Sequence, residues 1–362
     1  MRVLIILPQP YGTPWNDGVK NLTRAFARYL EQHGDDVCVA SRSGSVRSDE
    51  NHPMSAPPPT VTGLASKVVL LRNVLSAKKQ FRPDVVLLFV SCNSLLGLKT
   101  WIIRYLLGKS PVTYVPGLRA PTIGFNLLLT TDRILVGSPF LLRYLPSARV
   151  VFPFAPVNLR PDDELPTSAG QQRLDGVARK FLFLGTWENG RGLEDLLKAT
   201  AIARAIVPIE LIVALNGYGG RDPQTLTRLI GELGLEEAVD LRGNVDITEV
   251  YRDADVVVIP RNKPFRMAFP LRIVESLVMR KPLIVTTVCD MHKLIQGCGI
   301  AVEPRSPERL AEAMIELAAN EKLYRECQEN CAIRAVDYDS RVSLGQLRTE
   351  LIESLPPQGV FA

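Results

Sequence analysis

The segment PFRMAFPLRIVESLVMRKPLIVTT, residues 264–287, places an acidic residue, Glu275, inside an otherwise apolar predicted helix. Pro270 is typical of a first helical turn, so the pattern predicts a helix that begins near Leu271 and is followed by a strand. The free N–H groups and positive partial charge of a helix start suit a diphosphate. Arg272 and Glu275 are three residues apart and share one face of this helix. A cation beside phosphates and a carboxylate that accepts ribose hydroxyls would together hold a nucleotide sugar. A solvent-facing glutamate on an amphipathic helix is the alternative.

The elements that position these residues belong to two predicted domains. Strands and helices alternate along residues 1–155 and again from Lys180, which predicts two parallel sheets covered on both faces. We therefore expect an α/β fold with two Rossmann-like domains facing a central cleft, and ligands at the carboxyl ends of the strands. The predicted boundaries are 1–155 for the first domain, 156–336 for the second and 337–362 for a C-terminal helix that packs back on the first. Residues 43–63 are predicted to be a mobile loop, and residues 158–175 the junction.

Composition and charge narrow the class of protein. The chain has 362 residues, of which 46% are hydrophobic and 22% charged, as in a soluble globular protein. The N-terminal run MRVLIILPQP is predicted to be a first strand and not a signal peptide. Six dispersed cysteines indicate reduced thiols in a cytoplasmic protein. Residues 1–155 carry a net charge of +10 and the remainder −5. This asymmetry indicates either an anionic partner, such as a membrane surface or a phosphorylated acceptor, or solvated surface charge.

Five segments carry a resemblance to a known family. They are FLFLGTWENGRGLEDLLKA, ALNGYGG, LRGNVDITEVYRDADVVVIP, PLRIVESLVMRKPLIVTT and GIAVEPRSPERLAEAMIELA. In order and spacing they resemble the nucleotide-sugar domain of the GT-B, family-4 retaining glycosyltransferases, over about residues 181–319. The resemblance is weaker over residues 1–155.

The resemblance implies roles for individual residues. Glu275 matches the second acid of the Glu-x7-Glu motif and would bind ribose, and Arg191 would stabilise the departing diphosphate. Gly217 would line the nucleotide side of the pocket, where a missing side chain also permits close backbone approach. Gly243 and Val245 match the backbone that reads the base. Gly18, at the start of the first helix, would lie against the donor phosphates, although Asp17 beside it also suits a helix cap.

Two positions depart from the family pattern. Met267 stands where the first acid of the motif meets the donor sugar, and its thioether is a poor hydrogen-bond acceptor. Thr186 stands where the family often has a second cation. Met267 leaves two explanations open: a donor sugar whose hydroxyl groups need different hydrogen-bond partners, or an impaired site. Of the three histidines, only His292, in the loop after PLIVTT, is placed to approach the cleft, and a loop histidine without a role is the alternative.

The resemblance implies a metal-independent, retaining transfer of a sugar from a nucleoside-diphosphate donor to a hydroxyl acceptor, with no cofactor. A non-catalytic GT-B protein that binds a nucleotide sugar or supports a partner enzyme is the alternative, and a sugar-nucleotide epimerase is disfavoured by the scarcity of acid–base side chains. The hydroxyl-bearing acceptor is left open between a lipid-linked glycan, a polysaccharide and a small natural product, and it could be anionic. No nucleic-acid partner is expected. The basic first half and the helix at 96–107 leave open a peripheral position on the inner face of the cell membrane, or ordinary burial of that helix.

Overall fold

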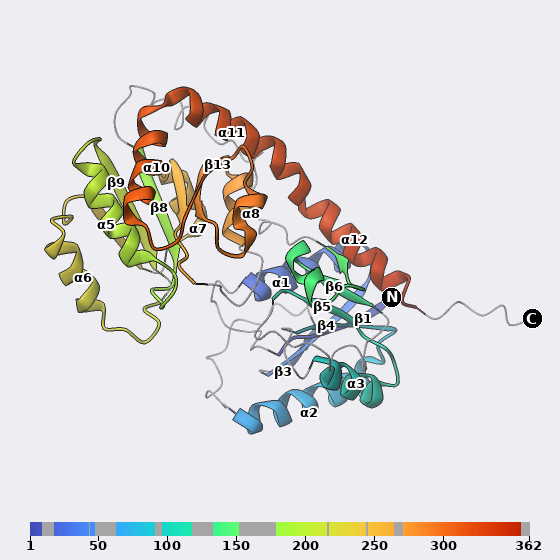
Figure 1. Cartoon of the computed structure of the whole chain (residues 1–362). Coiled ribbons are helices and arrows are strands. Elements are labelled where there is room, and N and C mark those ends of the chain that lie inside the picture. The colour runs from blue at the N-terminus through green and yellow to red at the C-terminus, as the bar shows by residue number, and fades with distance from the viewer. Residues whose placement is uncertain are drawn as a thin grey trace, which may run out of the picture. The chain divides into compact units, whose positions relative to one another are not determined.

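The computed structural model describes residues 1–8, 18–42, 44–47, 63–90, 96–117, 133–151, 179–215, 217–243, 245–263 and 271–355. These residues form two compact α/β units (Figure 1). The first unit contains the described residues up to Val151 together with those from Ser340 onward. The second contains the described residues from Arg179 to Asp339. The predicted junction at 158–175 lies outside the described residues.

The first unit is built on a seven-stranded sheet with the order β3-β2-β1-β4-β5-β6-β7. Neighbouring strands pair in parallel except for β2 and β3, which are antiparallel. The prediction of a mobile loop at 43–63 is wrong at Gly44–Arg47, because these residues form the edge strand β3. The strands are β1 (Arg2–Ile6), β2 (Asp36–Ser41), β3 (Gly44–Arg47), β4 (Val85–Phe89), β5 (Val112–Val115), β6 (Ile134–Val136) and β7 (Arg149–Val150).

Helices of the first unit are α1 (Gly18–Gln32), α2 (Gly63–Phe81), α3 (Leu96–Leu107) and α12 (Ser340–Ile352), with a 3-10 turn at Pro139–Arg143. The C-terminal helix α12 lies against α1 and β4. It is held by ion pairs from Arg348 to the buried Asp35 at 2.8 Å, and from Glu350 to Arg133 at 3.0 Å and Arg149 at 2.8 Å. The last helix of the chain therefore completes the unit formed by the first residues.

The second unit is built on a fully parallel six-stranded sheet with the order β10-β9-β8-β11-β12-β13. The strand order reverses between β8 and β11, as in a doubly wound dinucleotide-binding sheet. Its strands are β8 (Arg179–Gly185), β9 (Ile209–Leu215), β10 (Val239–Gly243), β11 (Val256–Ile259), β12 (Leu283–Thr286) and β13 (Gly299–Val302). Its helices are α5 (Leu193–Arg204), α6 (Pro223–Glu232), α7 (Ile247–Asp253), α8 (Leu271–Val278), α9 (Met291–Leu294), α10 (Pro307–Ala319) and α11 (Glu321–Ala335), with 3-10 turns at Val288–Asp290 and Val336–Tyr338.

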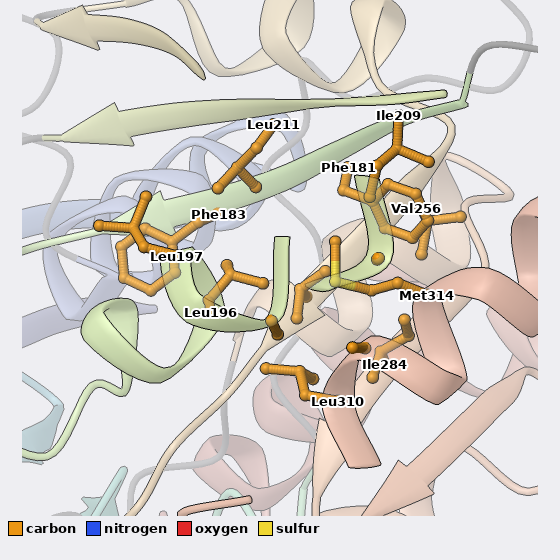
Figure 2. Packing of buried hydrophobic residues seen from close by; sticks show 14 of the residues in the cluster. Phe181, Phe183, Leu196, Leu197, Ile209, Leu211, Val256, Ile284, Leu310 and Met314 are labelled. Atoms are coloured by element: carbon orange, nitrogen blue, oxygen red, sulfur yellow. The ribbon is translucent and has the colours of Figure 1, made fainter. Parts of the chain in front are cut away.

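A large apolar core fixes this second sheet (Figure 2). Phe181 and Phe183 on β8 point to the same side and pack against Leu196 and Leu197 of α5. Met314 of α10 joins the same cluster. Because side chains alternate along a strand, Phe181 and Phe183 lie on the face of β8 that packs against the helices. The loop that carries candidate site residues follows the carboxyl end of the strand. The core thus sets the position of the carboxyl edge.

Candidate functional site

The candidate residues of the second unit follow its strands at one edge of the sheet. Since all six strands run parallel, their carboxyl ends lie at the same edge, and the reversal between β8 and β11 is where such sheets bind ligands. Arg191 lies in the connection after β8. Arg272 and Glu275 lie on α8, the first helix after β11. The sequence-predicted cations and carboxylate therefore come from the two strands that flank the reversal point.

The connections after β8 and β11 interlock through their backbones. Gly192 has a φ of 80°, and a Cβ placed on it would lie 1.6 Å from the carbonyl oxygen of Pro260. The backbone N–H of Asn262 donates to the carbonyl of Gly190 at 3.2 Å. Lys263 Nζ donates to Asn189 Oδ1 at 3.1 Å. The glycines of ENGRG are thus needed for this close approach, which fixes the turn that carries Arg191.

Arg191 is a partly buried cation with a second cation nearby. Its Nε lies 4.0 Å from Glu188 Oε2, and its side chain is 25% exposed. Burial lowers the pKa of Arg191, Glu188 opposes that effect, and the positive charge of Arg272 lowers the pKa further. The two guanidinium charges therefore repel each other. A site that gathers two cations favours a polyanion.

Glu275 is buried and tied to two neighbours. Its side chain is 3% exposed, so the alternative of a solvent-facing glutamate is wrong. The Tyr251 hydroxyl donates to Glu275 Oε2 at 2.9 Å, and Arg272 Nη1 donates to the same oxygen at 2.7 Å. Burial opposes the charge of Arg272, but Glu275 and Tyr251 hold the pKa of the guanidinium above its ordinary value. Burial, reinforced by Glu275, raises the pKa of Tyr251 well above its ordinary range.

The loop after β9 packs on the loop after β8. The N–H of Trp187 donates to the carbonyl of Gly217 at 2.9 Å. A Cβ on Gly219, whose φ is 60°, would lie 2.6 Å from Glu188 Cγ. Arg221 stacks 4.7 Å above the Trp187 ring, and both side chains bond to Glu194. Gly219 therefore has a packing reason to be there, since a side chain at this position would keep the two loops apart.

The other predicted site residues lie at the edge strand β10, in the first unit or outside the described residues. Gly243 is exposed at the end of the edge strand β10, and Val245, just beyond it, is half-buried. Gly18 belongs to the first unit, where it begins α1. Met267 lies outside the described residues, as do Pro270 and Asp17. The structure thus brings together Arg191, Arg272 and Glu275, with Gly217 on the adjoining loop.

Sequence reasoning misses Tyr251. It lies on α7, is fully buried and is the neutral partner of Glu275. A local pattern could have indicated it, because Val250 and Tyr251 are the apolar residues before the strand DVVVIP and would be buried. A buried tyrosine needs a partner for its hydroxyl. Thr186, where the resemblance expected a cation, is half-buried, and its Oγ1 has no hydrogen-bond partner among the described residues.

Histidine and cysteine have no evident part in this region. His292 is half-buried on α9, after β12. Cys38, Cys298, Cys327 and Cys331 are buried, and none of these four is part of a disulfide. Across the ranges that the structure describes, no group of three or more His, Cys, Asp and Glu side chains is arranged to hold a metal ion.

A match to a known family of proteins falls in the second unit. Residues 178–320 match the family described as Glycosyl transferases group 1. Over these residues the chain is similar to the group 1 glycosyltransferases. A D-inositol 3-phosphate glycosyltransferase of Mycolicibacterium gilvum is 27% identical over 153 residues, which is 40% of this chain and 33% of that protein. An alpha-D-kanosaminyltransferase of Streptomyces kanamyceticus is 29% identical over 158 residues, which is 42% of this chain and 39% of that protein. The chain thus spans well under half the length of these curated relatives.

Solved structures of glycosyltransferases match over nearly the whole chain. A glycosyltransferase of Rickettsia africae has a TM-score of 0.75 at 16% identity, covering 99% of each chain. A sucrose-phosphate synthase of Thermosynechococcus elongatus has a TM-score of 0.71 at 18% identity, covering 98% of this chain and 99% of that one. HepE of Anabaena, solved with UDP-glucose, has a TM-score of 0.70 at 17% identity, covering 98% of this chain and all of that one. The predicted fold class is confirmed in that the chain has the two α/β domains of a GT-B fold.

Proposed function

We propose that this chain is a retaining glycosyltransferase that moves a sugar from a nucleoside-diphosphate donor to a hydroxyl acceptor without a metal ion or other cofactor. The observation that carries the proposal is the convergence of Arg191 and Arg272 at the carboxyl edge of the second sheet, beside the start of α8. Two cations and a helix N-terminus together favour the negative charge of a diphosphate. That sheet edge is also where doubly wound folds bind nucleotides.

Glu275 is assigned to the ribose. Its Oε2 is taken by Tyr251 and Arg272, and Oε1 accepts no hydrogen bond from the residues that the structure describes. A ribose hydroxyl that donates to Oε1 would complete the carboxylate without breaking its existing bonds. Tyr251 and Arg272 then act as positioning residues, because they hold the carboxylate in one orientation. Arg272 has the further role of placing charge near the phosphates.

The reaction would proceed by departure of the diphosphate. The bond between the anomeric carbon and the diphosphate oxygen breaks, and negative charge develops on that oxygen, where Arg191 stabilises it. The acceptor hydroxyl forms the new bond to the anomeric carbon from the same face and passes its proton to the departing diphosphate. Such a mechanism needs orientation and charge stabilisation more than an acid–base side chain.

Binding is tested first. Thermal unfolding of the purified chain would be followed with UDP, ADP, GDP and their glucose conjugates, with UDP and UDP-glucose first because HepE, a neighbour in fold, is solved with them. A bound ligand at 100 times its Kd raises the stability by about 2.7 kcal/mol. We expect one base to be selected. No shift with any nucleotide would contradict the proposed donor site.

Transfer is tested with two variants and a control. Arg191→Ala should lower kcat about 100- to 1000-fold, as the loss of a donor to a developing oxyanion does. Glu275→Gln should weaken donor binding. The control is Arg228→Ala, which changes an arginine on α6 that is 70% exposed and should alter neither kcat nor donor binding. Nucleotide binding without transfer or donor hydrolysis, across a panel of sugars, would favour the non-catalytic alternative that Met267 suggests.

A further inference from the structure

The helices α2 and α3 of the first unit have a basic character with no acidic residue. Neither helix contains an aspartate or a glutamate. Lys67, Arg72, Lys79 and Arg104 are exposed. A fifth cation, Lys78, donates to the carbonyl of Leu106 at 2.7 Å and so joins the two helices. The outer surface of this helix pair is therefore positively charged, and no side chain of either helix neutralises it.

Apolar side chains are exposed among these cations. On α2, Val68 and Leu75 are 59% and 44% exposed. They alternate with Arg72 and Lys79 at spacings of four, three and four residues, which places all four on one stripe of the helix. Exposed valine and leucine between exposed cations are costly in water unless a partner covers them.

The stripe on α3 contains the largest exposed apolar groups. Trp101 is 50% exposed and Tyr105 is 76% exposed. Their rings stack with centroids 5.8 Å apart and planes 16° from parallel, and with Arg104 and Gly108 they line a surface hollow. Leu98, 37% exposed, lies one turn before Trp101 on the same stripe. Because the two rings stack on each other, they form one continuous aromatic surface that a partner could cover.

Both stripes point away from the same face of the sheet. Val74 and Ala77 of α2 pack in one cluster with Ile103 and Leu107 of α3, against alternate residues of β1, β2 and β4. The exposed stripes are on the opposite sides of these helices. Figure 1 shows α2 and α3 beside each other along the first unit. We call the exposed residues Lys67, Val68, Arg72, Leu75, Lys79, Leu98, Trp101, Arg104 and Tyr105 the α2–α3 face.

We propose that the α2–α3 face docks on the surface of an anionic lipid bilayer. Its chemistry fits that partner: tryptophan and tyrosine sit at the headgroup level, short apolar side chains enter the acyl boundary, and lysine and arginine meet anionic headgroups. A nucleic acid would satisfy the cations but not the valine and leucines. Among the helices that the structure describes, none combines the length and hydropathy that a bilayer crossing needs. The contact would therefore lie in the interface plane. It is independent of the donor site proposed above.

The probe is a sedimentation assay with the full chain and vesicles of phosphatidylglycerol and phosphatidylcholine, compared with phosphatidylcholine alone. We expect binding to the anionic vesicles that falls as salt rises. Arg72→Gln with Lys79→Gln should weaken it about 25-fold, since each cation near an anionic surface contributes about fivefold. Trp101→Ala with Tyr105→Ala should weaken it about tenfold or more, and a blue shift of tryptophan emission should vanish in Trp101→Phe.

Matched controls come from the second unit. Arg228→Gln with Lys322→Gln removes two cations that are 70% and 86% exposed, and Ile333→Ser with Val336→Ser removes two apolar residues that are each 69% exposed. Both controls should leave vesicle binding unchanged. The proposal is overturned if anionic vesicles do not bind at low salt, or if the controls weaken binding as much as the α2–α3 variants do. A dimer that Trp101→Ala with Tyr105→Ala dissociates, without vesicle binding, would overturn it in favour of an interface between copies. Nucleotide-induced thermal shifts should be equal in all these variants. Either proposal, the bilayer contact or the donor site, can therefore be contradicted without the other.

Discussion

Replacing Tyr251 by phenylalanine isolates the hydrogen bond that positions Glu275. The ring stays in the core, and only the hydroxyl that donates to Glu275 Oε2 at 2.9 Å is removed. A hydrogen bond to a charged group contributes about 1.5–3 kcal/mol to stability. Since Arg272 still donates to the same oxygen at 2.7 Å, the carboxylate keeps one partner, and we expect a loss of about 2 kcal/mol. For a unit of this size that loss lowers Tm by about 4–8 °C.

The assay is a double-mutant cycle in urea with Tyr251→Phe, Glu275→Gln and both together. The two side chains are in contact, so their coupling should be about 1–2 kcal/mol, within the range of neighbouring buried pairs. Tyr324→Phe is the control, because its hydroxyl donates to the neutral carbonyl of Asp255 at 3.4 Å and accepts from the neutral amide of Gln328 at 3.1 Å, and the loss of neutral partners should cost less. Donor affinity should fall together with stability in Tyr251→Phe if the bond orients the carboxylate. Additivity within about 0.5 kcal/mol, with donor affinity unchanged, would refute the reasoning.

Two further predictions test the backbone contact at the site and the titration of the core. Gly192→Ala should destabilise the second unit by about 2–5 kcal/mol and displace Arg191, because its Cβ would overlap the Pro260 carbonyl oxygen. Gly220→Ala, at a similar φ of 82° but with open space around it, should cost only about 1–2 kcal/mol in the same urea titration, and equal costs would contradict the overlap argument. Burial raises the pKa of Cys327 to about 11, above its value in the unfolded chain, so the unfolded state loses this proton first and stability is lost as pH rises from about 9 to 11. Over that window the wild type, kept reduced, should lose up to about 1.4 kcal/mol per pH unit more than Cys327→Ala, and parallel pH profiles would show that Cys327 does not titrate as inferred.

The local pattern of the sequence predicts most of the fold. Helices at 18–32 and 96–107 and the strand at 239–243 begin and end where the structure places them. Their apolar periodicity directly reflects which side of each element is buried. The edge strand β3 is missed, because Gly44–Arg47 lies in a stretch rich in serine and charge. It forms where it pairs with β2, and this pairing partner is not visible in its own residues.

The chemistry of the candidate site divides in the same way. The sequence by itself places Arg272 and Glu275 one turn apart at the start of a helix, since helical spacing is a local property. Only the tertiary structure decides that Glu275 is buried, that Tyr251 from α7 donates to it, and that Arg191 from another connection lies near enough to Arg272 to change its own pKa. These interactions join residues 24 to 81 positions apart, and they depend on the order in which β8 and β11 adjoin in the sheet. Residue type and spacing thus determined which groups are available, and the packing of parallel strands decided which of them meet.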